Sequence, residues 1–424
     1  GTRAFFYAPT DVAGMVTYRP VPEGREDDLK RLLQYSFVPE RGNAPESYRL
    51  SWPPDLYDLR GLFEDGDLRS ACKRYRFDAS VRGQRRSIGG LGALATFPDL
   101  RRQGYARRLT RHVLEEFREE GIDLVALWPS TIDYHRKQGW GIAHEFRRYE
   151  FTPEQLRFAD RPAGRYTAVT GDDWERLRGV EQGARRTLSL RRSETWWRER
   201  TLGDWAGSGD PFAFGYERDG SLRGFVVYTI ERESGTTPHE AVRRLRVRQL
   251  SAVDDEGLRA LLHFLGGHDS QVDTVELRRP PECRLLERVR APETATCTVE
   301  PGPMVRLTGV DALERLPWPE ALDTEFTLRV TDPLVEANDG RFRVTVSDGT
   351  PSVEPVATGG HAGDSAEDGG ADAVTDIETL SQLYVGTYEV RRAEQLGNCN
   401  FEESVIEPLS EVFSEEQLAL SAFF

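Results

Sequence analysis

The same order of predicted helices and strands occurs twice in the first 300 residues. This repeat restricts the folds that the chain can adopt more than any other feature of the sequence. In its first occurrence, an amphipathic helix over 24–37 precedes two strands, 71–79 and 87–97, with a polar stretch before them. A glycine-containing turn, a second helix over 104–119 and a buried strand over 123–128 complete it. This order predicts an α+β fold in which helices cover a sheet.

The second occurrence is weaker and starts at a helix from Gly171. A hairpin is predicted around Asp219-Gly220, a dipeptide that favours tight turns between alternating runs. A strand over 245–252, a helix over 257–265 and a strand over 274–277 follow. We interpret this segment as a second, degenerate copy of the first unit.

A third unit starts near Pro301 and differs from the first two. Strands over 326–330 and 342–346 flank a turn, and an amphipathic helix begins at Ile377. The segment 357–373 is small and acidic, which predicts a surface loop. Because 424 residues exceed what one core usually organises, we predict domains over 1–150, 151–300 and 301–424.

Charge and composition restrict the partners. The net charge of -15 disfavours nonspecific binding to nucleic acid or anionic lipid, since phosphates would be repelled. No apolar run reaches the length of a membrane helix, so we expect a soluble, cytoplasmic protein without a membrane partner. The four cysteines lie far apart and form no C-x-x-C pair, so neither a disulfide framework nor a metal site is expected.

The turn between the second strand and the second helix carries the main chemical signal. It reads Arg101-Arg102-Gln103-Gly104-Tyr105-Ala106 and is similar to the Q/R-x-x-G-x-G/A pattern of GNAT acetyltransferases. The start of a helix has unpaired N–H groups and a positive dipole end, and Gly104 and Ala106 are small enough for a pyrophosphate to approach the backbone. Arg101 and Arg102 add charge-assisted hydrogen bonds.

The second copy provides an internal control for this interpretation. Its corresponding turn, 251–257, contains Asp254, Asp255 and Glu256 where the first copy has arginines. Three carboxylates would repel a pyrophosphate, so we expect no cofactor in the second copy.

Two further segments of the first unit can serve acyl transfer. Backbone groups of Leu94, Ala95 and Thr96 could contact a pantetheine arm, and an N–H near Leu94 could polarise a thioester carbonyl, although an ordinary buried strand explains the same residues. After the 123–128 strand, Tyr134 is a candidate proton donor to a departing thiolate, although a packed aromatic with a solvated hydroxyl explains it too, and His135 is its rival.

With all three units considered, the chain resembles the enhanced-intracellular-survival (Eis) family of N-acetyltransferases over nearly its whole length. The resemblance rests on LATFPDLRRQGYARRL, YHRKQGWG, FTLRVTD, DGRFRVTVSDG, DIETLSQLYVG and the terminal SAFF. It implies tandem GNAT acyltransferase domains, the second degenerate, followed by a sterol-carrier-protein-like α+β domain.

The resemblance also implies the chemistry. Acetyl-coenzyme A is the implied co-substrate, and an amine of a small molecule, such as an aminoglycoside-like polyamine, or of a peptide lysine is the implied acceptor. The carboxylate of Phe424 would act as general base and Tyr134 as general acid, and a homo-oligomer, a hexamer, is implied. Without the resemblance, Phe424 would be read as part of a hydrophobic tail that docks the last helix.

Aromatic residues are candidates for the acceptor pocket, where they could hold a cation by cation–π contact, although core packing would explain each of them too. They are Tyr35, Phe37, Trp196 and Trp197. Two rival interpretations remain: a ligand-binding protein whose third unit sequesters an apolar molecule beside a vestigial acyltransferase domain, and an aminoacyl transferase that uses charged transfer RNA. The acidic balance and the arginine-glycine turn disfavour the second.

Overall fold

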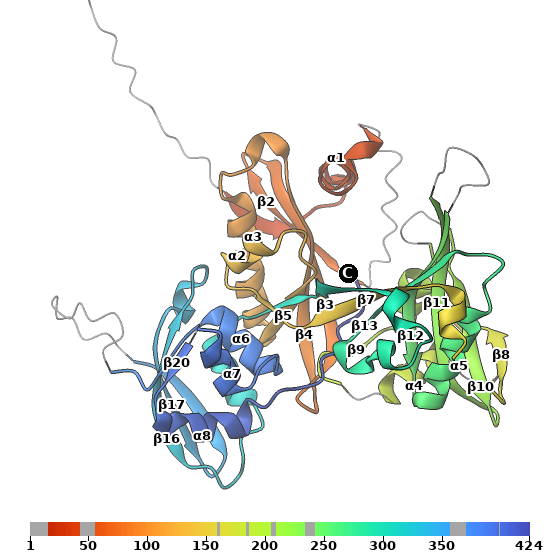
Figure 1. Ribbon diagram of the computed structural model, residues 1–424. Helices are drawn as coiled ribbons and strands as arrows, with labels where there is room; N and C mark the ends of the chain where they lie inside the picture. Colours follow the sequence, from red (N-terminus) through yellow and green to blue (C-terminus); the bar gives the residue numbers. More distant parts are fainter. Residues whose placement is uncertain are drawn as a thin grey trace, which may run out of the picture.

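The computed structural model describes residues 16–42, 56–158, 162–183, 186–204, 209–233, 242–356, 370–397 and 399–424. Within them the strands form three sheets, of eight, seven and five strands. Each sheet carries its own helices, and the C-terminus lies between the first two units rather than beside the third (Figure 1). In the part of the chain so described, no helix has both the length and the apolar character to cross a membrane.

The first sheet has the order β1-β2-β3-β4-β5-β15-β6, where β15 is Met304–Leu307, and β9 (Leu190–Arg191) also pairs with β3. Its long central hairpin turns at Arg82-Gly83, where both residues have positive φ, as a two-residue turn requires. The elements that the first unit contributes are β1 (Thr17–Pro20), α1 (Glu26–Phe37), β2 (Asp58–Glu64), β3 (Asp67–Val81), β4 (Gln84–Thr96), α2 (Tyr105–Glu119), β5 (Leu124–Leu127), α3 (Ile132–Arg136) and β6 (Gly141–Ile142).

The second sheet has the order β14-β7-β13-β12-β11-β10-β8. Its elements are β7 (Glu145–Phe151), β8 (Arg165–Ala168), α4 (Trp174–Gly183), a π-helical segment (Trp196–Thr201), β10 (Phe212–Arg218), β11 (Ser221–Glu233), β12 (Val242–Ala252), α5 (Asp255–Gly266), β13 (Thr274–Arg279) and β14 (Thr296–Pro301). The strand β9 (Leu190–Arg191) lies in the same stretch of sequence but joins the first sheet.

The two GNAT-like units exchange strands at their junction. β7 follows the first sheet in sequence but pairs with β13 and β14, and β15 (Met304–Leu307) returns to pair with β5 and β6.

The third unit is a five-stranded sheet covered by helices. Its elements are β16 (Thr324–Thr331), β17 (Gly340–Ser347), β18 (Thr350–Pro355), β19 (Ala373–Asp376), α6 (Ile377–Val385), α7 (Val390–Gln395), β20 (Cys399–Phe401) and α8 (Glu403–Val412). A fully buried ion pair, Arg306 with Asp332 at 2.6 Å, joins it to the first sheet. Gln382 of α6 also donates to the backbone oxygen of Ile142 at 2.9 Å, so the third unit holds the segment that follows α3.

The helices and strands predicted from periodicity are present, with two exceptions. The stretch before residue 70 is not merely polar, because β2 and β3 form a hairpin there that turns at Asp65-Gly66. That dipeptide between alternating runs was the available signal. The loop predicted over 357–373 extends too far, since Ala373 already begins β19, and residues 357–369 lie outside the described residues.

Candidate active site

Strands β4 and β5 separate from each other in the middle of the first sheet. β5 pairs in parallel with β4 only at Gly89 and Gly90, although β4 continues to Thr96. Opposite β3, the register passes from Gly92 to Ala95, and Ala93 in this bulge has a φ of +49°. Backbone groups beyond Gly90 therefore face a gap between the strands, where an extended chain such as pantetheine can pair with them.

The predicted anion-binding turn lies directly beyond this gap. Gly104 has a φ of +84° and is the N-cap of α2, and no side chain caps the helix. Arg101, Arg102, Gln103 and Gly104 are all exposed, and a Cβ on Gly104 would meet nothing within 4 Å. The first amides of a 15-residue helix are thus open to an anion, and the exposed Arg101 and Arg102 precede them in the same turn.

Tyr105 and Ala106 have different surroundings from the four residues before them. The Tyr105 side chain is buried, and its hydroxyl donates to the Glu64 carboxylate at 2.6 Å, which raises the pKa of Tyr105. Of Tyr105, only the backbone amide could therefore contact an anion bound at the turn. Ala106 is half-buried, and its carbonyl accepts from Thr110 at 2.9 Å within α2.

The two candidate proton donors on α3 differ in burial. Tyr134 keeps 38% of its surface exposed, and burial of the rest raises the pKa of its hydroxyl, so the group stays protonated near neutral pH. His135 is buried, which lowers its pKa to about 4 and leaves the imidazole neutral. A neutral imidazole with that pKa is a poor proton donor at neutral pH, so Tyr134 remains the candidate of the two.

A cleft of about 450 Å³ opens at the end of β5, immediately before Tyr134. It is lined by Trp128, Pro129, Ser130, Thr131, Ile132, Asp133, Pro301 and Gly302. The indole N–H of Trp128 donates to the carbonyl of Ala422 at 2.9 Å, so the C-terminal segment passes beside this cleft.

The C-terminal segment enters the first unit along β4. A Cβ built on Gly92 would lie 3.3 Å from the carboxyl carbon of Phe424, and one on Gly90 would lie 2.9 Å from its ring. The Phe424 side chain is buried, with its ring centroid 4.9 Å from that of Phe77. Glycines at these two positions of β4 thus leave the space that the tail occupies.

The four aromatic pocket candidates occupy three places. Trp196 packs its ring against Phe77 at 5.4 Å, next to Phe424. Tyr35 and Phe37 are exposed at the end of α1, and the Arg101 guanidinium lies 5.2 Å from the Tyr35 ring centroid. Trp197 is fully buried in the core of the second unit, so the structure does not bring it to the other three.

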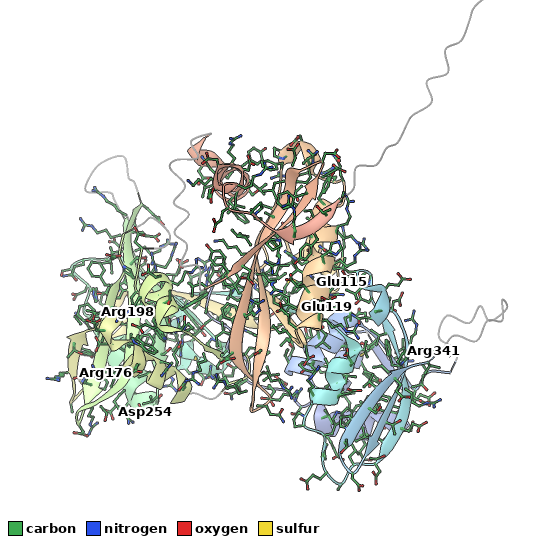
Figure 2. The ribbon with its side chains drawn as sticks, turned by 180° about the vertical axis from the view of Figure 1, so that it is seen from behind. Glu115, Glu119, Arg176, Arg198, Asp254 and Arg341 are labelled. Atoms are coloured by element: carbon green, nitrogen blue, oxygen red, sulfur yellow. The ribbon has the colours of Figure 1, made fainter. Side chains whose placement is uncertain are left out.

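The corresponding place in the second unit is closed. The Asp254 carboxylate, labelled in Figure 2, caps α5 by accepting from the Gly257 amide at 2.9 Å. A Cβ on Gly257 would lie 2.5 Å from the carbonyl oxygen of Arg223, so backbone covers the helix start. β12 also pairs with β13 over only three residues, but the Arg279 side chain crosses that gap to donate to the Leu250 carbonyl at 2.5 Å.

Three known domain families match the chain in succession. Residues 17–143 and 188–307 each match a model described as an acetyltransferase (GNAT) domain, and residues 310–421 match a sterol carrier protein domain. The protein is therefore a GNAT-type acetyltransferase with tandem GNAT domains and a sterol-carrier-like domain, which is the organisation that the Eis resemblance predicts.

Individual proteins agree with this assignment. An uncharacterized N-acetyltransferase of Streptomyces griseus is 26% identical over 371 residues, covering 81% of this chain and 83% of its own length. A probable N-acyltransferase from Enterococcus faecalis, at 19% identity, superposes with a TM-score of 0.79, and Eis1 from Mycobacterium abscessus, at 21% identity, with 0.72. Both structures cover 97% of this chain and match over their whole length, so they share the fold of all three units.

Proposed function

We propose that the protein transfers the acetyl group of acetyl-coenzyme A to a primary amine, on a polyamine such as an aminoglycoside or on a lysine side chain. The observation that carries the proposal is the uncapped start of α2 at Gly104, reached from the gap between β4 and β5. Arg101, Arg102 and Gln103 would hold the pyrophosphate with the first amides of α2, and Leu94 to Thr96 would hold the pantetheine arm.

The chemistry proposed is direct attack. An amine arrives mostly as ammonium near neutral pH, so a base must take its proton before its lone pair can attack the thioester carbonyl. The carboxylate at Phe424, which lies against Gly92, is our candidate for that base. Tyr134 would return a proton to the departing thiolate, and the N–H of Leu94 would stabilise the carbonyl oxygen during the attack.

The rival role as a carrier of apolar ligands has less support. In the third unit, the pocket among Leu313, Trp318, Phe326, Leu380 and Phe413 measures about 10 Å³, no more than one water molecule needs. A space of that size would not hold a lipid. The hexameric assembly stays a prediction.

An amine-panel assay tests the proposal. Polyamines, aminoglycosides and lysine peptides are offered with acetyl-coenzyme A, and thiol release is recorded. We expect release that depends on the amine, and turnover that falls at least about 100-fold when two or three residues are added after Phe424, since this moves the carboxylate away. Full turnover in the extended protein would contradict the role of Phe424, and no binding of acetyl-coenzyme A by the unaltered protein would contradict the whole proposal.

A further inference from the structure

Lys73 of β3 shares one face of the first sheet with the C-terminal carboxyl group. Its Cα pairs with Gly92 across β3 and β4, so the two residues project to the same face. Gly92 is the residue against which the carboxyl carbon of Phe424 lies, 3.3 Å from a Cβ position. The amine-bearing side chain and the proposed base therefore flank one glycine.

Aromatic rings continue this arrangement from the amine to the tail. The Lys73 ammonium nitrogen lies 4.5 Å from the ring centroid of Tyr57, which packs edge-on against Tyr75 at 5.3 Å. Tyr75 in turn contacts the Phe424 ring at 5.3 Å. The lysine is thus held at the side of the sheet where the tail ends.

The surroundings of Lys73 favour the neutral form of its amine. Burial, together with the positive charge of Arg200, lowers the pKa of the amine to about 8, against about 10.4 for a free lysine. The same Arg200 donates to the carbonyl of Phe423 at 3.1 Å, so it is fixed beside the tail. A larger fraction of Lys73 is consequently the neutral amine, which is the nucleophilic form.

The expected position of the thioester is close to Lys73 along the strand. The bulge at Ala93 and Leu94 begins one residue beyond Gly92, and each residue of a strand advances about 3.3 Å. A thioester carbonyl polarised by the Leu94 amide would therefore lie only a few strand residues from Lys73. The long lysine side chain can span that distance.

We propose that Lys73 is a self-acetylation site. This inference rests on the proposed function, because it uses the same cofactor, base and acid. The amine nitrogen of Lys73 forms a bond to the acetyl carbon as the carbon–sulfur bond breaks. The proton of the amine goes to the Phe424 carboxylate, and the thiolate takes a proton from Tyr134. The products are an Nε-acetylated Lys73 and free coenzyme A.

The chain offers its own control lysines, because only Lys30 and Lys137 accompany Lys73 in the sequence. Lys137 is exposed and lies three residues after Tyr134, so uncatalysed acetylation would favour it. Lys30 lies on α1, where it pairs with Asp27 at 3.9 Å.

The test incubates the full chain with trideuteroacetyl-coenzyme A and no acceptor, and quantifies label on each lysine peptide by mass spectrometry. We expect label on Lys73 at least ten times faster than on Lys137 or Lys30, at a rate per chain that does not change with protein concentration. The Gly104→Glu variant, which should not bind the cofactor, should lose the labelling, and Lys73→Arg should remove it from that peptide.

Three outcomes would overturn the inference: equal labelling of Lys137 and Lys73, a labelling rate proportional to protein concentration, or an unlabelled Lys73. If Lys73 stays unlabelled while an added amine still releases thiol, only the self-acetylation is wrong and the proposed function stands. If neither label nor thiol release is found and the cofactor does not bind, both fail.

Discussion

The two GNAT units have the same succession of strands and helices but opposite surroundings at the turn that starts their main helix. In the first unit, α2 begins at an exposed glycine beside arginines, with no side-chain cap. In the second, Asp254 caps α5 and ion-pairs with Arg223, which lies on the neighbouring strand. The fold alone therefore does not provide a cofactor site, and the side chains at one turn decide whether the helix start is available.

The gap between the parallel strands differs in the same way. In both units the two parallel strands, β4 with β5 and β12 with β13, pair over only two or three residues, so both gaps could accept an extended ligand. In the second unit, Arg279 bonds to the strand carbonyl across the gap and replaces such a ligand with a side chain. The second unit instead supplies Arg200, which donates to the carbonyl of Phe423 in the C-terminal tail, and Trp196, which packs on Phe77 beside the Phe424 ring.

The largest effect is expected at Gly104. In Gly104→Glu, a carboxylate stands where the pyrophosphate would approach the helix start, and affinity for acetyl-coenzyme A should fall more than about 100-fold. Calorimetry measures the change. Gly121→Glu is the matched control, because Gly121 also has a positive φ and open space around its Cβ position but lies beyond the other end of α2. An equal loss of affinity in both variants would mean that the substitution destabilises the protein rather than blocking the turn.

A smaller effect, on turnover only, is expected at Tyr134. Removing the hydroxyl in Tyr134→Phe should lower kcat about 100-fold and leave cofactor affinity nearly unchanged, since general acid catalysis contributes roughly that much. Burial raises the pKa of Tyr134, so the acid stays protonated, and kcat should show no loss attributable to it below about pH 10. His135→Asn should change kcat less than about threefold. A larger loss of kcat in His135→Asn than in Tyr134→Phe would make His135 the proton donor.

The arginines of the turn should each matter less than the glycine. Arg102→Gln removes one charge-assisted hydrogen bond of about 1.5 kcal/mol, so affinity for acetyl-coenzyme A should fall about tenfold. The loss should shrink when salt is raised, because the interaction is exposed. Unchanged affinity at low salt would show that Arg102 does not contact the cofactor.

The smallest effect is expected in the second unit. Arg279→Met opens the gap between β12 and β13 but leaves Asp254 as the cap of α5, so the protein should still bind one acetyl-coenzyme A per chain. Stability should fall by about 1 kcal/mol for the lost hydrogen bond. Binding of a second molecule per chain would mean that the two units differ less than we propose.

The sequence was sufficient for the local elements and for the contrast between the two turns. Hydrophobic periodicity and turn dipeptides predicted α2, β4 and α5, because these signals are local. It could not reveal the exchange of β7 and β15 between sheets or the burial of Trp197, since both depend on how distant segments pack. The place of Lys73 near the tail could not be predicted for the same reason, because it depends on the register of Lys73 with Gly92.

Hydrogen–deuterium exchange with and without acetyl-coenzyme A tests the central contrast most directly, because it follows both turns in one protein. We predict that the cofactor slows exchange of amides over 93–106, at the β4 bulge and the start of α2. Amides over 247–258, at the corresponding place in the second unit, should not change. Protection at the second segment, or none at the first, would contradict the account.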